Sequence, residues 1–244
     1  MASAARRYQG EIHDKLGFFA TWLPADPIEV GDIGLLEGGR FRRMTSLREL
    51  GVTCTTETGA VSQDLQYTST HGTSMTSSAG ADAAVVEAEI SIKFSKAGAF
   101  VFHASGLRMH RIETPTAVGM ELLRLHRDGR WDGDWLLVEA LHSAKRATIL
   151  VSEDASGELV LAAKTAGLQP ILSLADPKIS LGVASVRGSI VQAVSHPGLH
   201  PLYSCLRVRD PLFGPTSVHP VRGPDDVSPE DLFVRPAIDE LLSS

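Results

Sequence analysis

The clearest alternation of apolar and polar residues lies between Glu87 and Ala104. In the run EISIKF, isoleucine and phenylalanine alternate with polar residues, and after Ala97 and Gly98 the alternation resumes with Phe100 and Phe102. Because successive side chains of a strand point to opposite faces, a period of two gives one apolar and one polar face. The segment therefore predicts strands broken near Gly98.

Further strands follow later in the chain. Residues 147–152 and 158–163 are predicted to form a hairpin, with the sequence Asp-Ala-Ser-Gly at 154–157 as its turn. Residues 179–194 and 202–209 are two more strand candidates. Together these segments favour a sheet built mainly from antiparallel neighbours.

Helical spacing is present between Thr116 and Arg127, where Val118, Leu122 and Leu125 form one apolar stripe. Since no internal repeat is visible, the predicted class is α+β. We expect a twisted, mostly antiparallel central sheet with surrounding helices and a C-terminal tail packed on the body.

The segment from Thr53 to Ser78 has an unusual composition, with 13 serine or threonine residues among 26. One interpretation is a surface loop or irregular hairpin. The other is a segment that refolds, because serine and threonine tolerate strands and move between environments at low cost. The sequence leaves both open.

Charge is concentrated at the C-terminal end. Residues 223–244 carry six acids and one base, so they supply −5 of the formal net charge of −6. The acids are Asp225, Asp226, Glu230, Asp231, Asp239 and Glu240. A proline-rich stretch leads into this tail, which also has apolar residues with which to dock. The predicted organisation is a body, residues 1–222, and an acidic autoinhibitory tail, residues 223–244, held by Leu232, Phe233, Ile238, Leu241 and Leu242.

The composition argues against several classes of function. Residues 1–222 carry 22 bases and 23 acids, so no basic surface for nucleic acid is indicated. Cys54 and Cys205 are the two cysteines and lie in no metal-binding motif, and Cys205 is expected in the core. No nucleophile elbow, phosphate loop or HExxH motif occurs. We expect neither an enzyme nor a bound metal or cofactor.

The N-terminal segment has Arg6 and Arg7 but no apolar run behind them before Gly17, so no signal peptide is predicted. Uninterrupted apolar runs of about 18 residues, the length that a spanning helix needs, are also absent from the sequence. The expected location is the cytoplasm.

Strands of alternating polarity are also what a membrane-inserting sheet would need. The candidate residues lie on the apolar rows of two regions, 85–104 and 147–163. They are Ile90, Ile92, Phe94, Phe100, Phe102, Ile149, Val151, Leu159 and Leu161. Soluble antiparallel sheets have the same alternation, so this pattern alone adds little.

Two stretches carry a resemblance to a known family: KFSKAGAFVFHASGLRMHRIE at 93–113, and WDGDWLLVEALHSAKRATILVSEDASGELVLAAK at 131–164. In order of elements, residues 85–210 resemble the middle of bacterial gasdermins. Relatives of that family carry a lipid-modified cysteine near the start, whereas residues 1–53 here contain none.

The resemblance implies a protein that is kept inactive by a C-terminal peptide until a partner protease removes it. Arg222 and Arg235 are candidate cleavage positions. The freed body would self-associate into a ring in the inner membrane and kill the cell in anti-phage defence. The alternative is a soluble β-rich recognition module that binds a protein partner through its tail or its Ser/Thr-rich segment.

Overall fold

The computed structural model describes residues 4–22, 28–37, 39–61, 64–79, 88–163, 174, 179, 181–208 and 233–234. The helices are α1 (Ala4–Leu16) and α2 (Pro115–Arg127). The strands are β1 (Phe19–Ala20), β2 (Asp32–Glu37), β3 (Arg40–Ser46), β4 (Thr56–Val61), β5 (Leu65–Thr68), β6 (Thr73–Ala79), β7 (Ala88–Phe94), β8 (Phe100–Ser105), β9 (Arg108–Ile112), β10 (Leu136–Ser152), β11 (Gly157–Ala163), β12 (Gly182–Arg187), β13 (Ile190–Val208) and β14 (Phe233–Val234).

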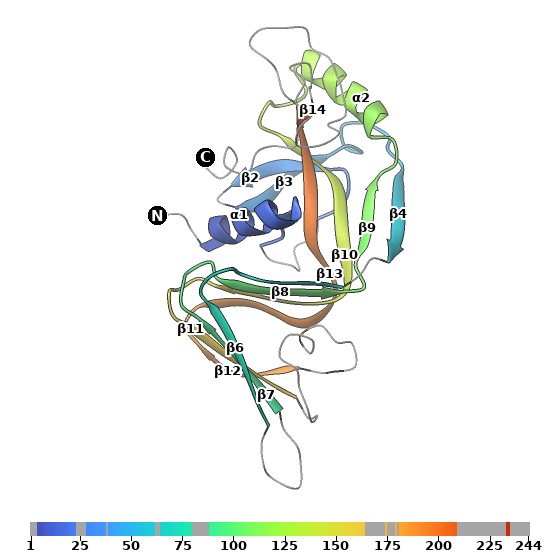
Figure 1. The fold of residues 1–244 in the computed structure, drawn as a ribbon. Coiled ribbons are helices and arrows are strands. Elements are labelled where there is room, and N and C mark those ends of the chain that lie inside the picture. Colours follow the sequence, from blue (N-terminus) through green and yellow to red (C-terminus); the bar gives the residue numbers. More distant parts are fainter. Residues whose placement is uncertain are drawn as a thin grey trace.

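Within the described residues the strands form two sheets, shown in Figure 1. The large sheet has ten strands in this part of the chain and is centred on the long pair β10 and β13. The other edge of β10 pairs in turn with β2, β9 and β8. The small sheet, as far as its residues are described, has four strands in the order β12-β11-β7-β6. All recorded pairings are antiparallel, which confirms the predicted α+β class with a mostly antiparallel sheet.

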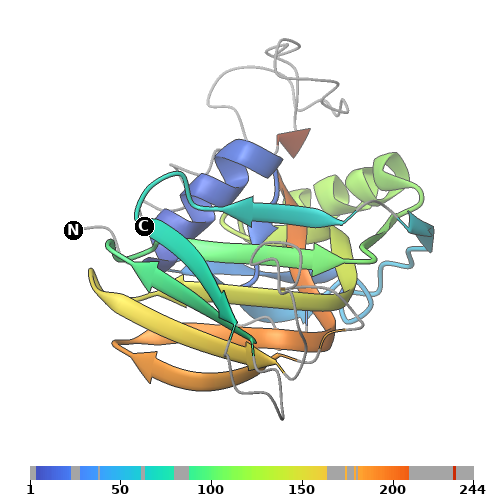
Figure 2. The ribbon, with the colours of Figure 1, turned by 60° about the horizontal axis from the view of Figure 1, so that its bottom comes forward.

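Four strands of the large sheet continue directly into the small one. The neighbours β5, β8, β10 and β13 are joined to β6, β7, β11 and β12, which have the same order in the small sheet. The four connections are residues 69–72, 95–99, 153–156 and 188–189. We call these strand pairs the four arches. Their turns lie along one end of the sheets, and the small sheet folds back over the large one (Figures 1 and 2).

Glycines make three of these turns possible. Gly72, Gly98 and Gly188 have φ angles of 90°, 82° and 81°, in the region that favours glycine because it has no Cβ. At Gly188 a Cβ would also lie 2.6 Å from the backbone oxygen of Ser156 in the neighbouring turn. The arches therefore turn tightly and side by side.

The predicted hairpin of residues 147–152 and 158–163 is wrong. Both segments are strands, but β10 pairs with β8 and β13, whereas β11 pairs with β7 and β12. Both edges of β10 are thus taken within the large sheet, so the chain after Ser152 passes into the second layer. The turn at 153–156 joins two sheets and not two paired strands.

The core has separate compartments on the two faces of the large sheet. On one face, α1 packs over Phe100 and Phe102 through Tyr8 and Ile12. On the other face, the small sheet covers Val101 and Leu150. Adjacent residues of β8 therefore belong to different compartments, as the period of two requires.

The sequence did not predict α1. Its signal is the apolar spacing of Ala5, Tyr8 and Ile12, which are all buried. Gln9 is fully buried between them, and its amide group accepts a hydrogen bond from the backbone N–H of Ala20 at 2.8 Å and donates to the carbonyl oxygen of Gly39 at 3.0 Å. One polar side chain thus joins the helix to β1 and to the turn between β2 and β3.

Other predicted segments are placed as follows. The helix at 116–127 is confirmed as α2, which begins at Pro115. The Ser/Thr-rich segment contains the strands β4, β5 and β6 and is not simply a loop. The strand candidate at 179–194 contains two strands, β12 and the start of β13, which are joined by the turn of one arch at 188–189.

Candidate functional site

The small sheet has two chemically different faces. Its inner face carries Ile90, Ile92 and Phe94 from β7 and Leu159 and Leu161 from β11, each at most 3% exposed. The outer face carries polar groups, among them Lys93 and Glu158, whose charged atoms lie 3.4 Å apart. Register places Ile92 beside Leu159 and Lys93 beside Glu158. The sheet is therefore amphipathic along β7, whereas the outer row of β11 also contains Val160 and Ala162. The apolar inner row of both strands is hidden against the large sheet.

The surface of the large sheet beneath it is more polar. Alternation places His103 and Thr148 on the same face as Val101 and Leu150, and both are completely buried. The Thr148 hydroxyl donates to the backbone carbonyl of Leu174. Neither ring nitrogen of His103 has a hydrogen-bond partner among the described residues, and burial lowers its pKa to about 4. The face of the large sheet in this contact is thus mixed, with Val101 and Leu150 beside His103 and Thr148.

The nine membrane-strand candidates divide into two groups. Ile90, Ile92, Phe94, Leu159 and Leu161 lie together on the inner face of the small sheet. Phe100, Phe102, Ile149 and Val151 lie on the opposite face of the large sheet, under α1. The structure therefore brings the first five together and separates them from the other four.

The tail touches the body at one described place. Residues Phe233–Val234 form β14, which pairs with β13 in the register Arg207↔Val234 and Val208↔Phe233. The side chain of Phe233 is not described. Leu232, Ile238, Leu241 and Leu242 and the candidate cleavage positions Arg222 and Arg235 lie outside the described residues.

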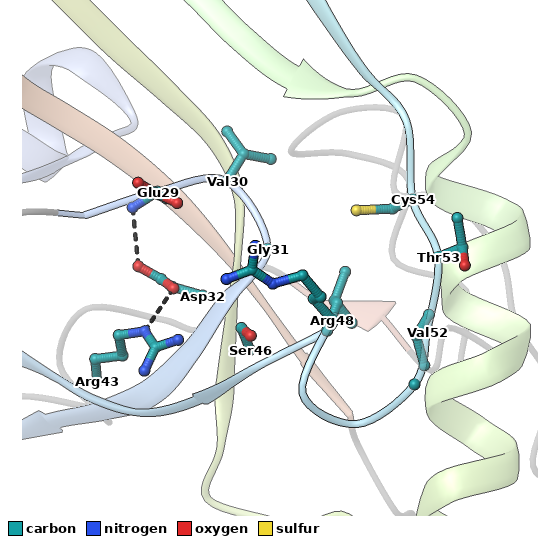
Figure 3. Close-up of a pocket in the computed structure, with 12 residues that line it drawn as sticks. Glu29, Val30, Gly31, Asp32, Arg43, Ser46, Arg48, Val52, Thr53 and Cys54 are labelled. Atoms are coloured by element: carbon teal, nitrogen blue, oxygen red, sulfur yellow. Dashed lines mark hydrogen bonds and ion pairs between the residues drawn. The ribbon is translucent and has the colours of Figure 1, made fainter.

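A cavity of about 380 Å³ opens between the start of β2 and the loop that follows β3 (Figure 3). Arg48 lies across it and Cys54 lies at its far wall. Burial raises the pKa of the Cys54 thiol, so this thiol stays protonated and is a poor nucleophile. Cys205, which is 1% exposed, belongs to the core as predicted.

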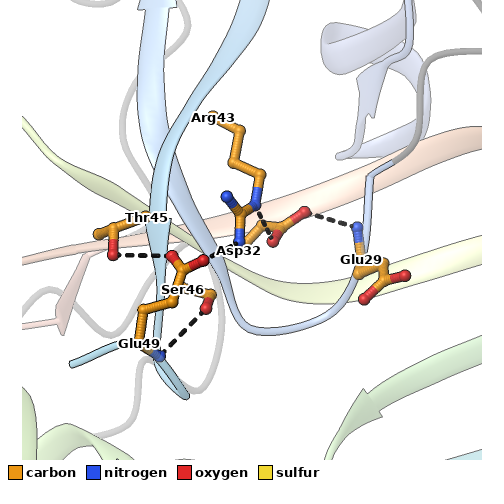
Figure 4. A network of polar contacts seen from close by, with 6 residues as sticks. All are labelled: Glu29, Asp32, Arg43, Thr45, Ser46 and Glu49. Atoms are coloured by element: carbon orange, nitrogen blue, oxygen red, sulfur yellow. Dashed lines mark hydrogen bonds and ion pairs between the residues drawn. The ribbon is translucent and has the colours of Figure 1, made fainter. Parts of the chain in front are cut away.

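An ion-pair network borders this cavity (Figure 4). The Asp32 carboxylate is almost buried and accepts hydrogen bonds from Arg43 Nε at 2.8 Å and from the backbone N–H of Glu29 at 2.9 Å. The hydrogen bond to Asp32 is the main cause of a raised pKa of Arg43. Hydrogen bonds from Arg43 and Thr45 lower the pKa of Glu49. The side chains of this network pair with one another and with the backbone of Glu29, so the network stabilises the start of β2.

Replacing Asp32 by alanine is expected to reduce the free energy of unfolding by about 1.5 kcal/mol, because two hydrogen bonds to a buried carboxylate are lost. The matched control is Glu37→Ala on the same hairpin. Its ion pair with Arg42, at 2.7 Å, is more than half exposed, so its loss should cost under about 1 kcal/mol. Urea unfolding of both variants measures the difference, and equal losses would contradict the structural role of Asp32.

A hydrogen-bonded chain crosses β4, β9 and β10. Ser143 Oγ lies 2.8 Å from His110 Nε2, and His110 Nδ1 lies 3.0 Å from Thr58 Oγ1. A serine beside a histidine is the first half of a catalytic triad, but a neutral threonine cannot stabilise an imidazolium as a carboxylate does. The group joins three strands and has no further catalytic partner among the described residues.

In the described part of the chain, no three or more His, Cys, Asp or Glu side chains are arranged to hold a metal ion. The helices described there are also too short or too polar to cross a membrane. The features that remain are the amphipathic small sheet, its four turns and the docked tail strand.

Comparisons with known proteins give little more. No protein-family model matches the sequence, and no curated protein matches it significantly. Among solved structures, the cryo-EM structure of the gasdermin A3 membrane pore matches over 85% of this chain and 90% of that chain, with 11% identity and a TM-score of 0.33. A match this loose carries no argument, so any functional proposal depends on the features of the chain itself.

Proposed function

We propose that this chain is an autoinhibited pore-forming protein. A protease removes the acidic tail, and the body then self-associates into a ring and inserts strands into the membrane. The observation that carries the proposal is the small sheet. Its two central strands carry an apolar face, four turns connect its strands to strands of the large sheet, and in this proposal it swings away from the large sheet when the arches open.

The apolar face suits a lipid environment. If the small sheet left the body, the row Ile90, Ile92 and Phe94 and the row Leu159 and Leu161 would face acyl chains, while Lys93 and Glu158 would face water. A crossing strand needs about 9 to 11 residues, and β7 and β11 have seven each. Two to four flanking residues would be enough to complete each one.

The edges of this sheet support self-association. Among the described residues, the outer edges of β6 and β12 have no strand partner. In a membrane every backbone polar group must be paired, so open edges are not tolerated. Joining β6 of one copy to β12 of the next would pair both edges and close a ring. In this proposal β8 and β10 remain in the body.

Charge supports the role of the tail. Its removal takes away −5 and leaves residues 1–222 at −1, which reduces repulsion from an anionic leaflet such as the bacterial inner membrane. The biological setting that we propose, following the sequence resemblance, is cell death in anti-phage defence, with a cytoplasmic resting form.

Dye release from anionic liposomes tests this function. The full-length chain should release no dye, and a chain ending at Arg222 should release it. Within the truncated chain, Ile92→Asn should abolish release, because it places an amide on the face that would meet lipid. Ser91→Asn, one residue away on the opposite face, is the matched control and should keep it. Circular dichroism of the full-length variants checks that both fold. No release from a folded truncated chain would refute the proposal.

One observation favours the alternative of a recognition module. All six residues of β4, in the Ser/Thr-rich segment, are exposed, and an exposed edge strand can bind an extended segment of a partner. A recognition module would be inert to liposomes both with and without its tail, so the same experiment separates the two functions.

A further inference from the structure

The outer edge of β13 is covered at two places only, among the described residues. Its inner edge pairs with β10 along most of its length. On the outer edge, β1 pairs with residues 202 and 203, and β14 pairs with residues 207 and 208. The N-terminal part of the chain and the tail thus share one sheet edge, and the tail occupies the end that lies near α2 (Figure 1).

We propose that the tail is held on the body by strand addition at Arg207–Val208, and that this backbone pairing, not the acidic charge of the tail, keeps it seated. The proposal rests on the proposed function and specifies how the inhibiting tail is retained. An unpaired sheet edge presents a row of N–H and C=O groups, and an extended segment satisfies them whatever its side chains are. The occupant is the segment Phe233–Val234 of the same chain.

Two arginines of the body near this edge are already paired with carboxylates. Arg124 on α2 lies 2.9 Å from Glu121 and 3.5 Å from Asp128, and Arg207 on β13 lies 3.2 Å from Asp134. An acidic tail that bound through these arginines would have to displace the carboxylates of the body. Surface ion pairs of this kind contribute little, so exchanging one for another gains almost nothing.

At this point the edge is anchored in the core of the body. Val208 is 3% exposed and packs in the cluster that contains Leu125, Trp131 and Leu137. Arg207 also donates from Nε to the carbonyl oxygen of Gly133 at 3.3 Å. Because packing in the core holds β13 in place, its edge is preformed for the addition of a strand. The pairing with β14 involves only two residue pairs, so it can be released. The edge of β13 at residues 207–208 therefore stays in place when β14 leaves it.

Hydrogen exchange on full-length variants in solution tests the proposal. Phe233→Pro and Val234→Pro each remove one backbone N–H, and neighbouring residues of a strand direct this group to opposite sides. The same alternation in β13 means that one of the amides of residues 207–208 faces β14 and the other faces β10. At least one of the two variants should make the amide that faces β14 exchange about fivefold to thirtyfold faster, as expected for the loss of one or two backbone hydrogen bonds. Ser243→Pro, outside β14, is the matched control and should leave exchange unchanged.

A variant that removes four acidic charges of the tail tests whether charge, and not backbone pairing, holds the tail. Replacing Asp225, Asp226 and Asp231 by asparagine and Glu230 by glutamine keeps the backbone donors, so exchange at 207–208 should match the parent protein. The proposal is overturned if both proline variants exchange like the parent, or if the charge variant exchanges as fast as the proline variants. Circular dichroism confirms that each variant folds.

The two proposals can fail separately. If a proline variant speeds exchange at residues 207–208 but neither that variant nor the truncated chain releases dye, strand addition of the tail is supported and pore formation is refuted. If truncation releases dye while both proline variants leave exchange unchanged, pore formation stands and strand addition fails.

Discussion

Acidification from pH 7 to pH 4 is expected to remove about 3 kcal/mol from the free energy of unfolding through His103 alone. Burial lowers the pKa of this histidine to about 4, against an ordinary value near 6.5. Below about pH 6.5 the unfolded chain therefore binds a proton that the folded chain does not bind until about pH 4. Stability falls as the pH falls through this window.

His103→Leu isolates this contribution. The ring forms no hydrogen bond with the described residues, and its neighbours across the two adjacent strands, Thr148 and Gln66, do not titrate. An apolar replacement should therefore leave stability at pH 7 nearly unchanged. Chemical unfolding at pH 7 and pH 4 should show a loss about 3 kcal/mol smaller in the variant than in the parent. Equal losses would show that His103 is not neutral in the folded protein.

Gly34→Ala is expected to cost about 3 kcal/mol or more. Gly34 lies in β2 beside a register shift in its pairing with β3, and a Cβ there would lie 2.2 Å from the backbone oxygen of Arg42. Backbone cannot move aside as a flexible side chain can, so the hairpin of β2 and β3 must separate locally.

Gly10→Ala is the matched control for that substitution. Gly10 lies within α1 and a Cβ there meets nothing within 4 Å, so alanine should stabilise the helix by about 0.5 to 1 kcal/mol. Thermal unfolding of both variants checks the prediction. A Gly34→Ala protein as stable as the parent would show that the two strands are not so closely paired.

Local pattern was a good guide to single elements in this chain. The alternation around Ile92 and the break near Gly98 correspond to β7, the turn at 95–99 and β8, and the stripe through Leu122 corresponds to α2. Period and turn residues are properties of a few neighbouring positions, so they can be read from the sequence.

The pairing of strands within the sheets could not be predicted in the same way. The sequence around the turn at 153–156 looks like a hairpin, yet β10 and β11 lie in different sheets. Which strand pairs with which depends on residues far away in the chain. The division of Ile92 and Phe102 between two core compartments follows from this layering.

The missed helix has a similar cause. Arg6, Arg7 and the other polar residues make the first 16 residues resemble a charged leader, and the few apolar positions that signal a buried face include two alanines. The tail strand was also beyond prediction from pattern, because two residues of β14 carry no period.

During synthesis the strands of the four arches become available one after another. The strands β6 and β7 leave the ribosome early, but β11, which covers the other edge of β7, begins only at residue 157. From residue 94 to residue 157 a ribosome needs roughly 3 to 13 seconds at about 5 to 20 residues per second. During that interval the apolar row of β7 has neither β11 beside it nor the completed large sheet to cover it. A nascent chain of this protein should therefore depend on a holding chaperone more than its modest size suggests.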